Sequence, residues 1–318
     1  MEYFLGVDGG GSKTKFVLAD ANLNIVKSEI KEGCDFYRIG IDGVCKIFLE
    51  GTKALLKGFD ENFESIKSAT WGIPRYGEND GADIKITSYL KKMIPNAKQT
   101  FYNDVDLGIA GSLALESGIH IVSGTGAIAI GKDQDGNTFR CSGWDENFGD
   151  EGSSYWLGLN ALRLFSMESD GRKPKGALYT IIKDSYNLQK DFDLIDYFYE
   201  NLLNKREKIA SLQFLLYKAA VAGDISAIDL YKDAAFELSL AVKTLIKKIN
   251  FNKKEILVSY SGGTFKAGEL ILKPFKNFLS DYSIKLTRPI FEPYIGALLL
   301  ASEEFVDKEL YNNLKRQV

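Results

Sequence analysis

Histidine and cysteine are scarce in this chain of 318 residues, which contains one histidine, His120, and three cysteines. Metal sites built from imidazoles and nucleophiles activated by histidine are therefore difficult to assemble. Cys34, Cys45 and Cys141 are widely spaced, with no Cys-x-x-Cys pair and no pattern typical of a disulfide framework. We expect His120 to be satisfied locally within an apolar strand, and we expect any general base to be a carboxylate.

The sequence also lacks long apolar runs and an excess of charge of one sign. Its longest apolar runs, such as 295–301, are too short to cross a bilayer. The 43 acidic and 40 basic residues are interspersed, so no basic face for nucleic acid is indicated. The N-terminus enters an apolar strand without a basic leader region. We therefore expect a cytoplasmic protein that binds neither nucleic acid nor a membrane.

An internal duplication is the main architectural signal. Strand 3–8, a glycine turn, strand 15–20, an Asp/Asn turn and a third strand from residue 25 follow one another. The same succession returns with strands 119–122 and 127–131, followed by a third strand from residue 138. Periodicity and turn residues also predict helices at 39–57, 82–93, 105–116 and 265–280, strands at 66–72, 98–103 and 255–260, a mostly helical stretch at 153–248 and terminal helices from about 293.

The first glycine turn, between Asp8 and Thr14, fits neither of two common nucleotide-binding loops. A Walker A loop needs lysine where Ser12 stands, and a dinucleotide fingerprint needs a helix where a strand follows. Two readings remain, an ordinary hairpin and a hairpin whose amides and hydroxyls face a phosphate. The candidate phosphate-binding residues are Gly10, Gly11, Ser12, Lys13 and Thr14. Asp8 would hold Mg2+ through water.

Two later turns support the phosphate reading. Gly124, Thr125 and Gly126 occupy the equivalent place in the second copy. Gly262 and Gly263 follow strand 255–260 and precede a helix, an arrangement suited to the adenosine and α-phosphate of a nucleotide. We therefore expect ATP and Mg2+ as cofactors.

These segments resemble the actin, heat-shock chaperone and sugar kinase superfamily. Within it they are most similar to the N-acetylglucosamine kinase branch, which is related to the activator ATPases of benzoyl-CoA reductase. The resemblance rests on segments 6–14, 103–104, 123–126, 143–153 and 261–263. It implies an α/β fold of two duplicated ribonuclease-H-like, actin-like ATPase lobes with an interlobe cleft.

The resemblance also implies the lobe boundaries and the reaction. The N-terminal, sugar-side lobe would comprise 1–115 and a C-terminal helix at about 304–318. The C-terminal lobe, 116–303, would hold the second phosphate turn, the adenosine site and a helical insertion. The reaction would be ATP-dependent phosphorylation of N-acetylglucosamine or N-acetylmuramic acid at the 6-hydroxyl, as in amino-sugar metabolism and cell-wall recycling. A homodimer is suggested by the resemblance alone.

Asp104 is the candidate general base. It ends strand 98–103 and precedes a helix, and aspartates at this position in similar kinases contact the hydroxyl that is phosphorylated. A helix N-cap is the alternative role for Asp104. The resemblance places Asn103 and Asp150 in the sugar site, where a carboxylate accepts two hydroxyl hydrogen bonds. Trp144 either stacks on the sugar or packs in the core.

Two positions depart from the pattern of the branch. Cys34-Asp35 stands where a Ser-Asn pair is usual, so the substrate-binding residue Asp35 offers only acceptors when ionised. Arg75 stands where we expect a small residue, and we hypothesise that it meets an anionic substituent such as the lactyl carboxylate of N-acetylmuramic acid. A solvated surface arginine is the alternative.

Three other functions stay open at the level of sequence. An activator ATPase of a radical dehydratase or reductase would hold an iron-sulfur cluster, but the three cysteines do not match that arrangement. A nucleotide switch of the actin or chaperone kind would have no use for a sugar site. A glucosamine kinase belongs to the same class as the main prediction.

Overall fold

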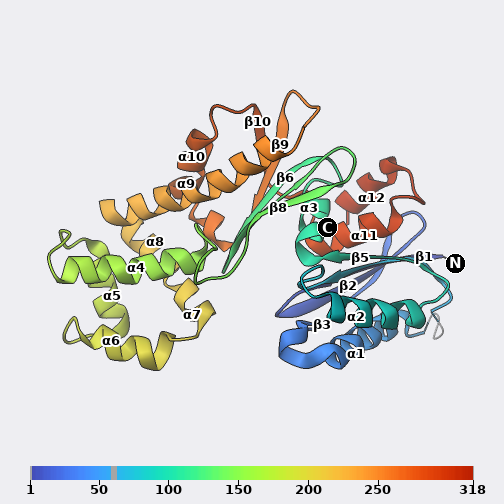
Figure 1. Ribbon diagram of the computed structural model, residues 1–318, viewed down its shortest axis with the longest axis horizontal. Helices are drawn as coiled ribbons and strands as arrows, with labels where there is room; N and C mark the ends of the chain where they lie inside the picture. Colours follow the sequence, from blue (N-terminus) through green and yellow to red (C-terminus); the bar gives the residue numbers. More distant parts are fainter. Residues whose placement is uncertain (1, 59–62, 318) are drawn as a thin grey trace. The chain divides into compact units, whose positions relative to one another are not determined.

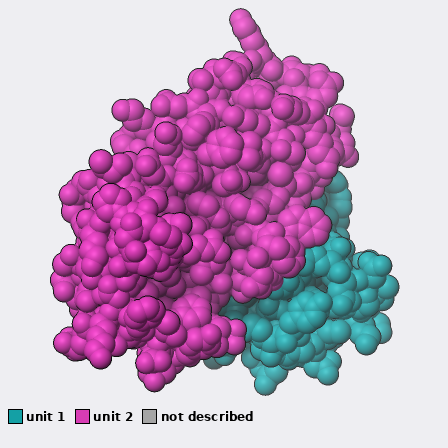
Figure 2. All heavy atoms as spheres, turned by 60° about the vertical axis from the view of Figure 1, so that its left-hand side comes forward, with its two compact units in different colours: residues 1–117, 289–318 teal, residues 118–288 magenta. Residues whose placement is uncertain are grey.

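The computed structural model describes residues 2–58 and 63–317 (Figure 1). Contacts between Cα atoms divide the chain into two units (Figure 2): unit 1 comprises residues 1–117 and 289–318, and unit 2 comprises residues 118–288. No helix among the described residues is long and apolar enough to span a membrane.

Unit 1 is built on a five-stranded sheet in the order β3-β2-β1-β4-β5. Strand β1 pairs antiparallel with β2 and parallel with β4. The elements are β1 (Tyr3–Gly9), β2 (Lys13–Asp20), β3 (Ile25–Glu32), α1 (Phe36–Leu56), β4 (Ile66–Ile73), α2 (Asp80–Met93), β5 (Lys98–Asn103), α3 (Asp104–Ser112), α11 (Pro293–Ser302), the short 3-10 helix η3 (Lys308–Leu310) and α12 (Tyr311–Lys315).

Both faces of this sheet are covered. Side chains such as Leu5 and Val7 pack with α1 and α2 in one apolar cluster, whereas Phe4 and Val17 pack with α11 and α12 in another. Figure 1 shows α1 and α2 on the side of the sheet opposite α11 and α12. Strands buried on both faces read as apolar runs, which explains why β1 and β4 were recognisable in the sequence.

Unit 2 repeats the same sheet, in the order β10-β9-β6-β7-β8. Strand β6 pairs antiparallel with β7 and parallel with β9, as β1 does with β2 and β4. Its elements are β6 (Gly118–Ser123), β7 (Ala127–Lys132), β8 (Thr138–Ser142), α4 (Ser154–Ser169), α5 (Ala177–Tyr186), α6 (Asp193–Tyr197), the π-helix η1 (Phe198–Leu202), α7 (Arg206–Ser211), α8 (Gln213–Val221), α9 (Ile225–Lys248), β9 (Ile256–Ser261), the 3-10 helix η2 (Gly263–Ala267), α10 (Glu269–Phe278) and β10 (Ile284–Thr287). The predicted duplication is confirmed.

The return of the chain to unit 1 differs from the expected boundary near residue 304, because residues 289–303 also group with unit 1. The cause is close packing of α11 on β1 and α3. A Cβ atom at Gly6 would lie 2.6 Å from the Leu298 nitrogen, and one at Gly296 would lie 2.2 Å from the Leu107 oxygen. Glycines that permit such backbone contact fix α11 on unit 1.

The remaining differences are local. Helix α1 begins at Phe36 rather than residue 39, but Gly40, with φ of 73°, interrupts it. The predicted helix 265–280 is divided into η2 and α10 at Gly268, with φ of 63°. Strand β10 was not predicted, because four residues between two turns give too short a period to recognise.

Candidate active site

The first glycine turn lies at one end of unit 1's sheet, supported from beneath by the chain after β3. The amide of Gly10 donates to the Lys13 oxygen at 3.0 Å, and the Cys34 amide donates to the Gly10 oxygen at 3.0 Å. Gly33 makes this approach possible, since a Cβ atom there would lie 2.2 Å from the Gly11 oxygen. The turn is thus held by backbone contacts that leave its outer side open.

The donors expected in this turn are not equally available. Gly11, Ser12 and Lys13 are exposed. Thr14 is buried, and its hydroxyl donates to the Glu32 oxygen at 2.7 Å. The exposed residues therefore remain candidates for phosphate binding, whereas the Thr14 side chain stabilises the sheet.

Two carboxylates lie behind this turn with raised pKa values. Burial and, to a smaller extent, the negative charge of Asp104 together raise the pKa of Asp8 to about 7, against the opposing effect of Lys13. Burial also raises the pKa of Asp104 to about 6, opposed by its hydrogen bond from the Val105 amide and assisted by the charge of Glu78. A pKa near 6 suits a general base, because such a group is largely ionised at neutral pH and still accepts a proton.

Asn103 and Asp104 form the junction between β5 and α3. Asn103 is the N-cap of α3, its side-chain oxygen accepting from the Val105 amide, and its amide group donates to the Tyr76 oxygen at 3.0 Å. Asp104 is the first helical residue and accepts from the Val105 amide at 3.0 Å. The expected cap is therefore the neighbour of Asp104, and the partly exposed Asp104 carboxylate retains acceptor capacity.

Asp35 and Arg75, the two departures from the branch pattern, contact each other. Asp35 caps α1, accepting from the Tyr37 amide at 2.9 Å, and its other oxygen lies 3.6 Å from Arg75 Nε. Glu78 lies 3.6 Å from Arg75 Nη1, and the guanidinium lies over the Tyr37 ring at 5.4 Å from the centroid. Half of the Arg75 side chain is exposed, so it is a surface arginine partly neutralised by two carboxylates.

The second glycine turn has a different support. The Gly124 oxygen accepts from the Ser154 amide at 2.8 Å, and the Thr125 oxygen accepts from the Tyr155 amide at 3.3 Å. Both donors belong to the first turn of α4, where amides otherwise lack helical partners. The turn is therefore held against a helix N-terminus by its own carbonyl groups.

Gly262 and Gly263 lie beside the second turn. A Cβ atom at Gly262, whose φ is 106°, would lie 2.2 Å from the Ser123 oxygen. Only glycine combines that dihedral with that approach. Gly263 begins η2, so strand, glycine and helix follow one another as expected for a nucleotide-binding segment.

Asp150 is buried beneath this turn rather than open to solvent. It is 4% exposed, has a φ of 59°, and accepts from the Ala127 amide at 3.1 Å. Its second oxygen accepts from the guanidinium of Arg206 on α7. Burial raises the pKa of Asp150, opposed by the Ala127 hydrogen bond and the Arg206 charge. The structure gives Asp150 two protein partners before any substrate binds.

Arg206 was missed by sequence reasoning, as was the role of Gly33. Arg206 lies 56 residues beyond Asp150 in a helical stretch rich in basic residues, so nothing local distinguishes it. A glycine directly before Cys34 was a weaker but available signal for Gly33, because glycine permits close backbone approach.

The exposure of Trp144 and of His120 shows which of the two residues packs in the core. Trp144 is 79% exposed, so it does not pack in the core. His120 is buried, and its two ring nitrogens lie 2.7 and 3.1 Å from the hydroxyls of Ser259 and Ser261. Burial lowers the pKa of His120 to about 4, which keeps the ring neutral. The local role predicted for His120 is confirmed.

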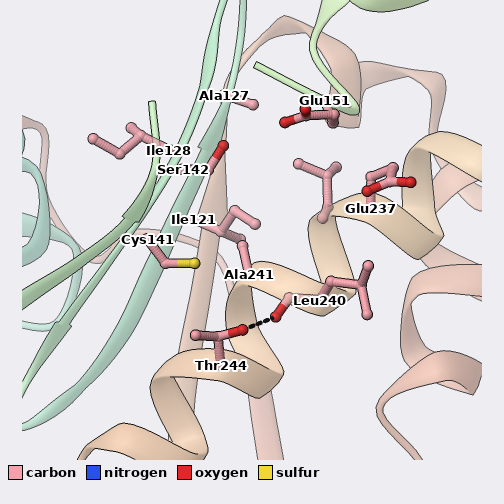
Figure 3. A pocket seen from close by; sticks show the side chains of 11 residues that line it. Ile121, Ala127, Ile128, Cys141, Ser142, Glu151, Glu237, Leu240, Ala241 and Thr244 are labelled. Carbon is pink, nitrogen blue, oxygen red and sulfur yellow. Dashed lines mark hydrogen bonds between the residues drawn. The ribbon is translucent and has the colours of Figure 1, made fainter. Parts of the chain in front are cut away.

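A cavity of about 170 Å³ in unit 2 lies between its sheet and α9 (Figure 3). Glu151 and Glu237 lie near one end and Thr244 at the other. None of the predicted site residues lines it. The lining consists of Ile121, Ala127, Ile128, Cys141, Ser142, Glu151, Glu237, Leu238, Leu240, Ala241 and Thr244.

Within residues 2–58 and 63–317, no group of three or more His, Cys, Asp and Glu side chains is placed to hold a metal ion. The mutual repulsion of Asp8 and Asp104 nevertheless fits a divalent cation, which would favour the ionised forms of both. Such a site would complete its shell with water and phosphate oxygens, as Mg2+ commonly does.

The repeated sheet and its glycine turns define the class of actin-like ATPases and sugar kinases. The chain belongs to the BadF/BadG/BcrA/BcrD ATPase family, whose model matches residues 5–301. The predicted family is thereby confirmed.

Individual relatives are named as sugar kinases. The chain is 28% identical to an N-acetylmuramic acid/N-acetylglucosamine kinase of Clostridium acetobutylicum, over 96% of this chain and 99% of the relative. It is 27% identical to an N-acetyl-D-glucosamine kinase of Dictyostelium discoideum, over 94% and 98%. A solved Chromobacterium violaceum structure, provisionally named an N-acetylglucosamine kinase, shares the fold with a TM-score of 0.71 and 21% identity, over 95% and 99% of the two chains.

Proposed function

We propose that this protein transfers the γ-phosphoryl group of ATP to the 6-hydroxyl of an N-acetylated amino sugar, either N-acetylglucosamine or N-acetylmuramic acid. The observation that carries the proposal is the Asp8–Asp104 pair behind an exposed glycine turn, with the pKa of Asp104 raised to about 6. The names of the two relatives that match almost the full chain support the choice of sugar.

In this proposal Asp104 accepts the hydroxyl proton as the sugar oxygen bonds to the γ-phosphorus and the bond to the β,γ-bridging oxygen breaks. Phosphoryl transfer needs mainly positioning and charge neutralisation, so one base and oriented donors suffice. Gly10, Gly11, Ser12 and Lys13 would bind phosphate in unit 1, and Gly124, Thr125 and Gly126 in unit 2. Asp8 would hold Mg2+, which supplies charge neutralisation on the phosphates.

The remaining assignments follow the same proposal. Gly262 and Gly263 would contact the adenosine portion of ATP. Asp35 and Asp150 would accept hydrogen bonds from sugar hydroxyls, and the exposed Trp144 ring would stack on the sugar. The Asn103 side chain already donates to the Tyr76 oxygen and accepts from the Val105 amide, so a sugar contact would use its second N–H or its remaining lone pair. A homodimer, as the resemblance suggests, is tested by light scattering.

The test is coupled ADP release with ATP and Mg2+ against N-acetylglucosamine, N-acetylmuramic acid, glucosamine, glucose and N-acetylmannosamine. We expect turnover with the first two sugars and its loss in Asp104→Ala. Phosphate on the 6-oxygen is checked by phosphorus-proton correlation NMR of the product. A rate of ADP release that does not depend on any of the sugars would instead support an activator ATPase or a nucleotide switch. A preference for glucosamine would indicate a glucosamine kinase, which belongs to the same class of enzyme.

A further inference from the structure

One contact in unit 2 joins the helical insertion to the second glycine turn. Arg206 is the first residue of α7, and its Nη2 donates to Asp150 Oδ2. On its other side, Arg206 Nε lies 3.5 Å from Glu146 Oε2 without a hydrogen bond. The guanidinium therefore lies between two carboxylates of the loop that carries Asp150.

The ion pair lies directly against the backbone of the turn. A Cβ atom at Gly126 would come within 2.7 Å of both Arg206 Nη2 and Asp150 Oδ2. Asp150 Oδ1 accepts from the Ala127 amide, the residue that follows the turn. Each carboxylate oxygen thus has one protein donor and one lone pair left, so the orientation of the carboxylate is fixed while its capacity to accept remains.

Stability alone does not account for this arrangement. Only the Asp150 side of the ion pair is buried, since the Arg206 side chain is 37% exposed. Desolvation of the buried carboxylate opposes the attraction, so the pair contributes little net stability. Asp150 also adopts a left-handed backbone conformation, which is strained for a residue with a side chain. A strained backbone and a desolvated carboxylate that is held rigidly as an acceptor are together characteristic of a binding site.

We propose that Arg206 is a positioning residue that fixes the Asp150 carboxylate for two sugar hydroxyls and keeps it ionised. This inference rests on the proposed function, which assigns sugar binding to Asp150. Arg206 acts through Asp150, so the insertion that supplies α7 would take part in sugar recognition. Its loss should raise the KM for sugar and leave the KM for ATP nearly unchanged.

A pH effect follows from the charges around Asp150. Burial is the main cause that raises the Asp150 pKa, and the charges of Glu146 and Asp145 from the same loop add to it, whereas the Ala127 hydrogen bond and the Arg206 charge lower it. Tyr155 on α4 lies near the same charges. Without Arg206 the Asp150 carboxyl faces two acidic neighbours and stays protonated to higher pH. The acidic limb of kcat/KM for sugar should then move to higher pH.

The experiment compares wild type with Arg206→Met, Arg206→Lys and the control Lys208→Met, which removes a positive charge from an exposed side chain of the same helix. The first measurement needs no substrate. Hydrogen exchange of a peptide covering 123–130 should be faster in Arg206→Met, since the Ala127 amide loses a fixed acceptor. Arg206→Lys should lie between Arg206→Met and wild type, and Lys208→Met should match wild type.

Sugar kinetics supply the second measurement. We expect the KM for N-acetylglucosamine to rise about tenfold or more in Arg206→Met, the scale of one lost charged hydrogen bond. Partial recovery is expected in Arg206→Lys, and so is recovery of Arg206→Met by added guanidinium. A loss of kcat alone, or equal changes in both KM values, would contradict the proposal.

The two measurements separate the possible failures. Unchanged exchange at 123–130 would overturn the positioning role, whatever the kinetics. Faster exchange with unchanged sugar KM would overturn the role in sugar recognition. If the wild type turns over none of the sugars, the proposed function fails and with it the sugar-binding part of this inference, while the exchange data still decide whether Arg206 holds Asp150.

Discussion

The two units use the same strand-turn-strand motif, yet they support its glycine turn in different ways. In each, a glycine from a separate strand end lies against the turn: a Cβ atom at Gly33 or at Gly262 would lie 2.2 Å from a turn oxygen. In unit 1 the further support is the backbone before α1, at Cys34. In unit 2 it is a helix N-terminus, reinforced by the Asp150–Arg206 ion pair.

The electrostatics differ more than the backbone. Behind the first turn, burial is the main cause that raises the pKa of Asp8 to about 7, with the charge of Asp104 contributing, and the pKa of Asp104 to about 6. The carboxylate behind the second turn faces an arginine. Both units thus contain a glycine turn of the same kind, whereas the two acids with strongly raised pKa values lie in unit 1. The proposed proton transfer and metal binding would therefore be functions of unit 1. Perturbed acids of this kind are typical of catalytic sites.

The largest expected effect is the loss of Asp104. In Asp104→Asn the side chain keeps its size but no longer accepts a proton, so kcat should fall by about 10²–10⁴ with little change in KM for ATP. In wild type, kcat/KM should decline below about pH 6, where Asp104 becomes protonated. Steady-state ADP release from pH 5 to 9 measures both.

Asp106→Asn is the matched control, because it removes a neighbouring acid from the same helix turn. It should keep kcat near wild type and move the acidic limb slightly to lower pH, because the Asp106 charge contributes to the raised pKa of Asp104. Equal losses in the two variants would show that helix charge, not a base at Asp104, governs the rate.

The next largest effects are expected from substitutions at Gly33 and Gly262, the glycines that lie against the two turns. Gly33→Ala and Gly262→Ala each force a Cβ atom against a backbone oxygen, at a cost of about 1–3 kcal/mol in stability. The turns should shift, and KM for ATP should rise in both variants. Gly11→Ala and Gly124→Ala are controls for stability, because a Cβ atom at either position meets nothing within 4 Å.

Thermal unfolding and ATP kinetics of these four variants test whether the two supports are equivalent. Gly262→Ala should be the more destabilising of the pair, since its φ of 106° also disfavours a side chain. A Gly262→Ala protein as stable as Gly124→Ala would contradict the close approach.

Local signals explain what the sequence could predict. Strands β1 and β6 are apolar runs that end in glycine turns, and the Asp/Asn turns after β2 and β7 repeat with the same spacing. Asp104 was identifiable because it directly follows a strand. These features depend on neighbours within a few residues, as propensity and turn chemistry do.

What the sequence did not reveal depends on contacts between distant segments. Asp150 was assigned to the sugar from its motif alone, without its Arg206 partner. Asp35 and Arg75 were noted as separate departures, although the fold brings them within 3.6 Å. Buried polar groups must find partners, but sequence spacing does not say which partner, because that choice is made by packing.

A smaller effect is expected on stability in the variant Asp8→Asn. Because the folded state raises the Asp8 pKa from 3.8 to about 7, it binds the proton more tightly than the unfolded state. Stability from this group therefore falls as pH rises from about 4 to about 7. Asp8→Asn removes that loss and should be the more stable protein at pH 8, with the difference vanishing near pH 4. Thermal unfolding across this range without divalent cations measures it, and an Asp8→Asn protein less stable than wild type at pH 8 would contradict a repulsive acid pair.

The smallest expected effect concerns Arg75 and tests whether unit 1 distinguishes sugars by charge. Arg75 has a left-handed φ of 63°, so Arg75→Gly removes the guanidinium without backbone strain, unlike Arg75→Ala. The guanidinium is half exposed, and its loss also uncovers the negative charges of Asp35 and Glu78. Both effects should lower kcat/KM for N-acetylmuramic acid relative to N-acetylglucosamine, by about two- to fivefold at low salt, because exposed ion pairs contribute up to about 1 kcal/mol.

Salt dependence separates this electrostatic effect from a change of shape. In wild type the ratio of the two kcat/KM values should decline as ionic strength rises, and in Arg75→Gly it should be lower and depend on salt in the opposite sense, since Asp35 and Glu78 then repel the lactyl carboxylate. The control is Lys85→Ala, which removes an exposed positive charge from the same unit and should leave the ratio unchanged. Alanine is used here rather than glycine because Lys85 lies within α2, where glycine would destabilise the helix. A ratio identical in Arg75→Gly and wild type would mean that Arg75 only neutralises its two neighbours and does not select sugars by charge.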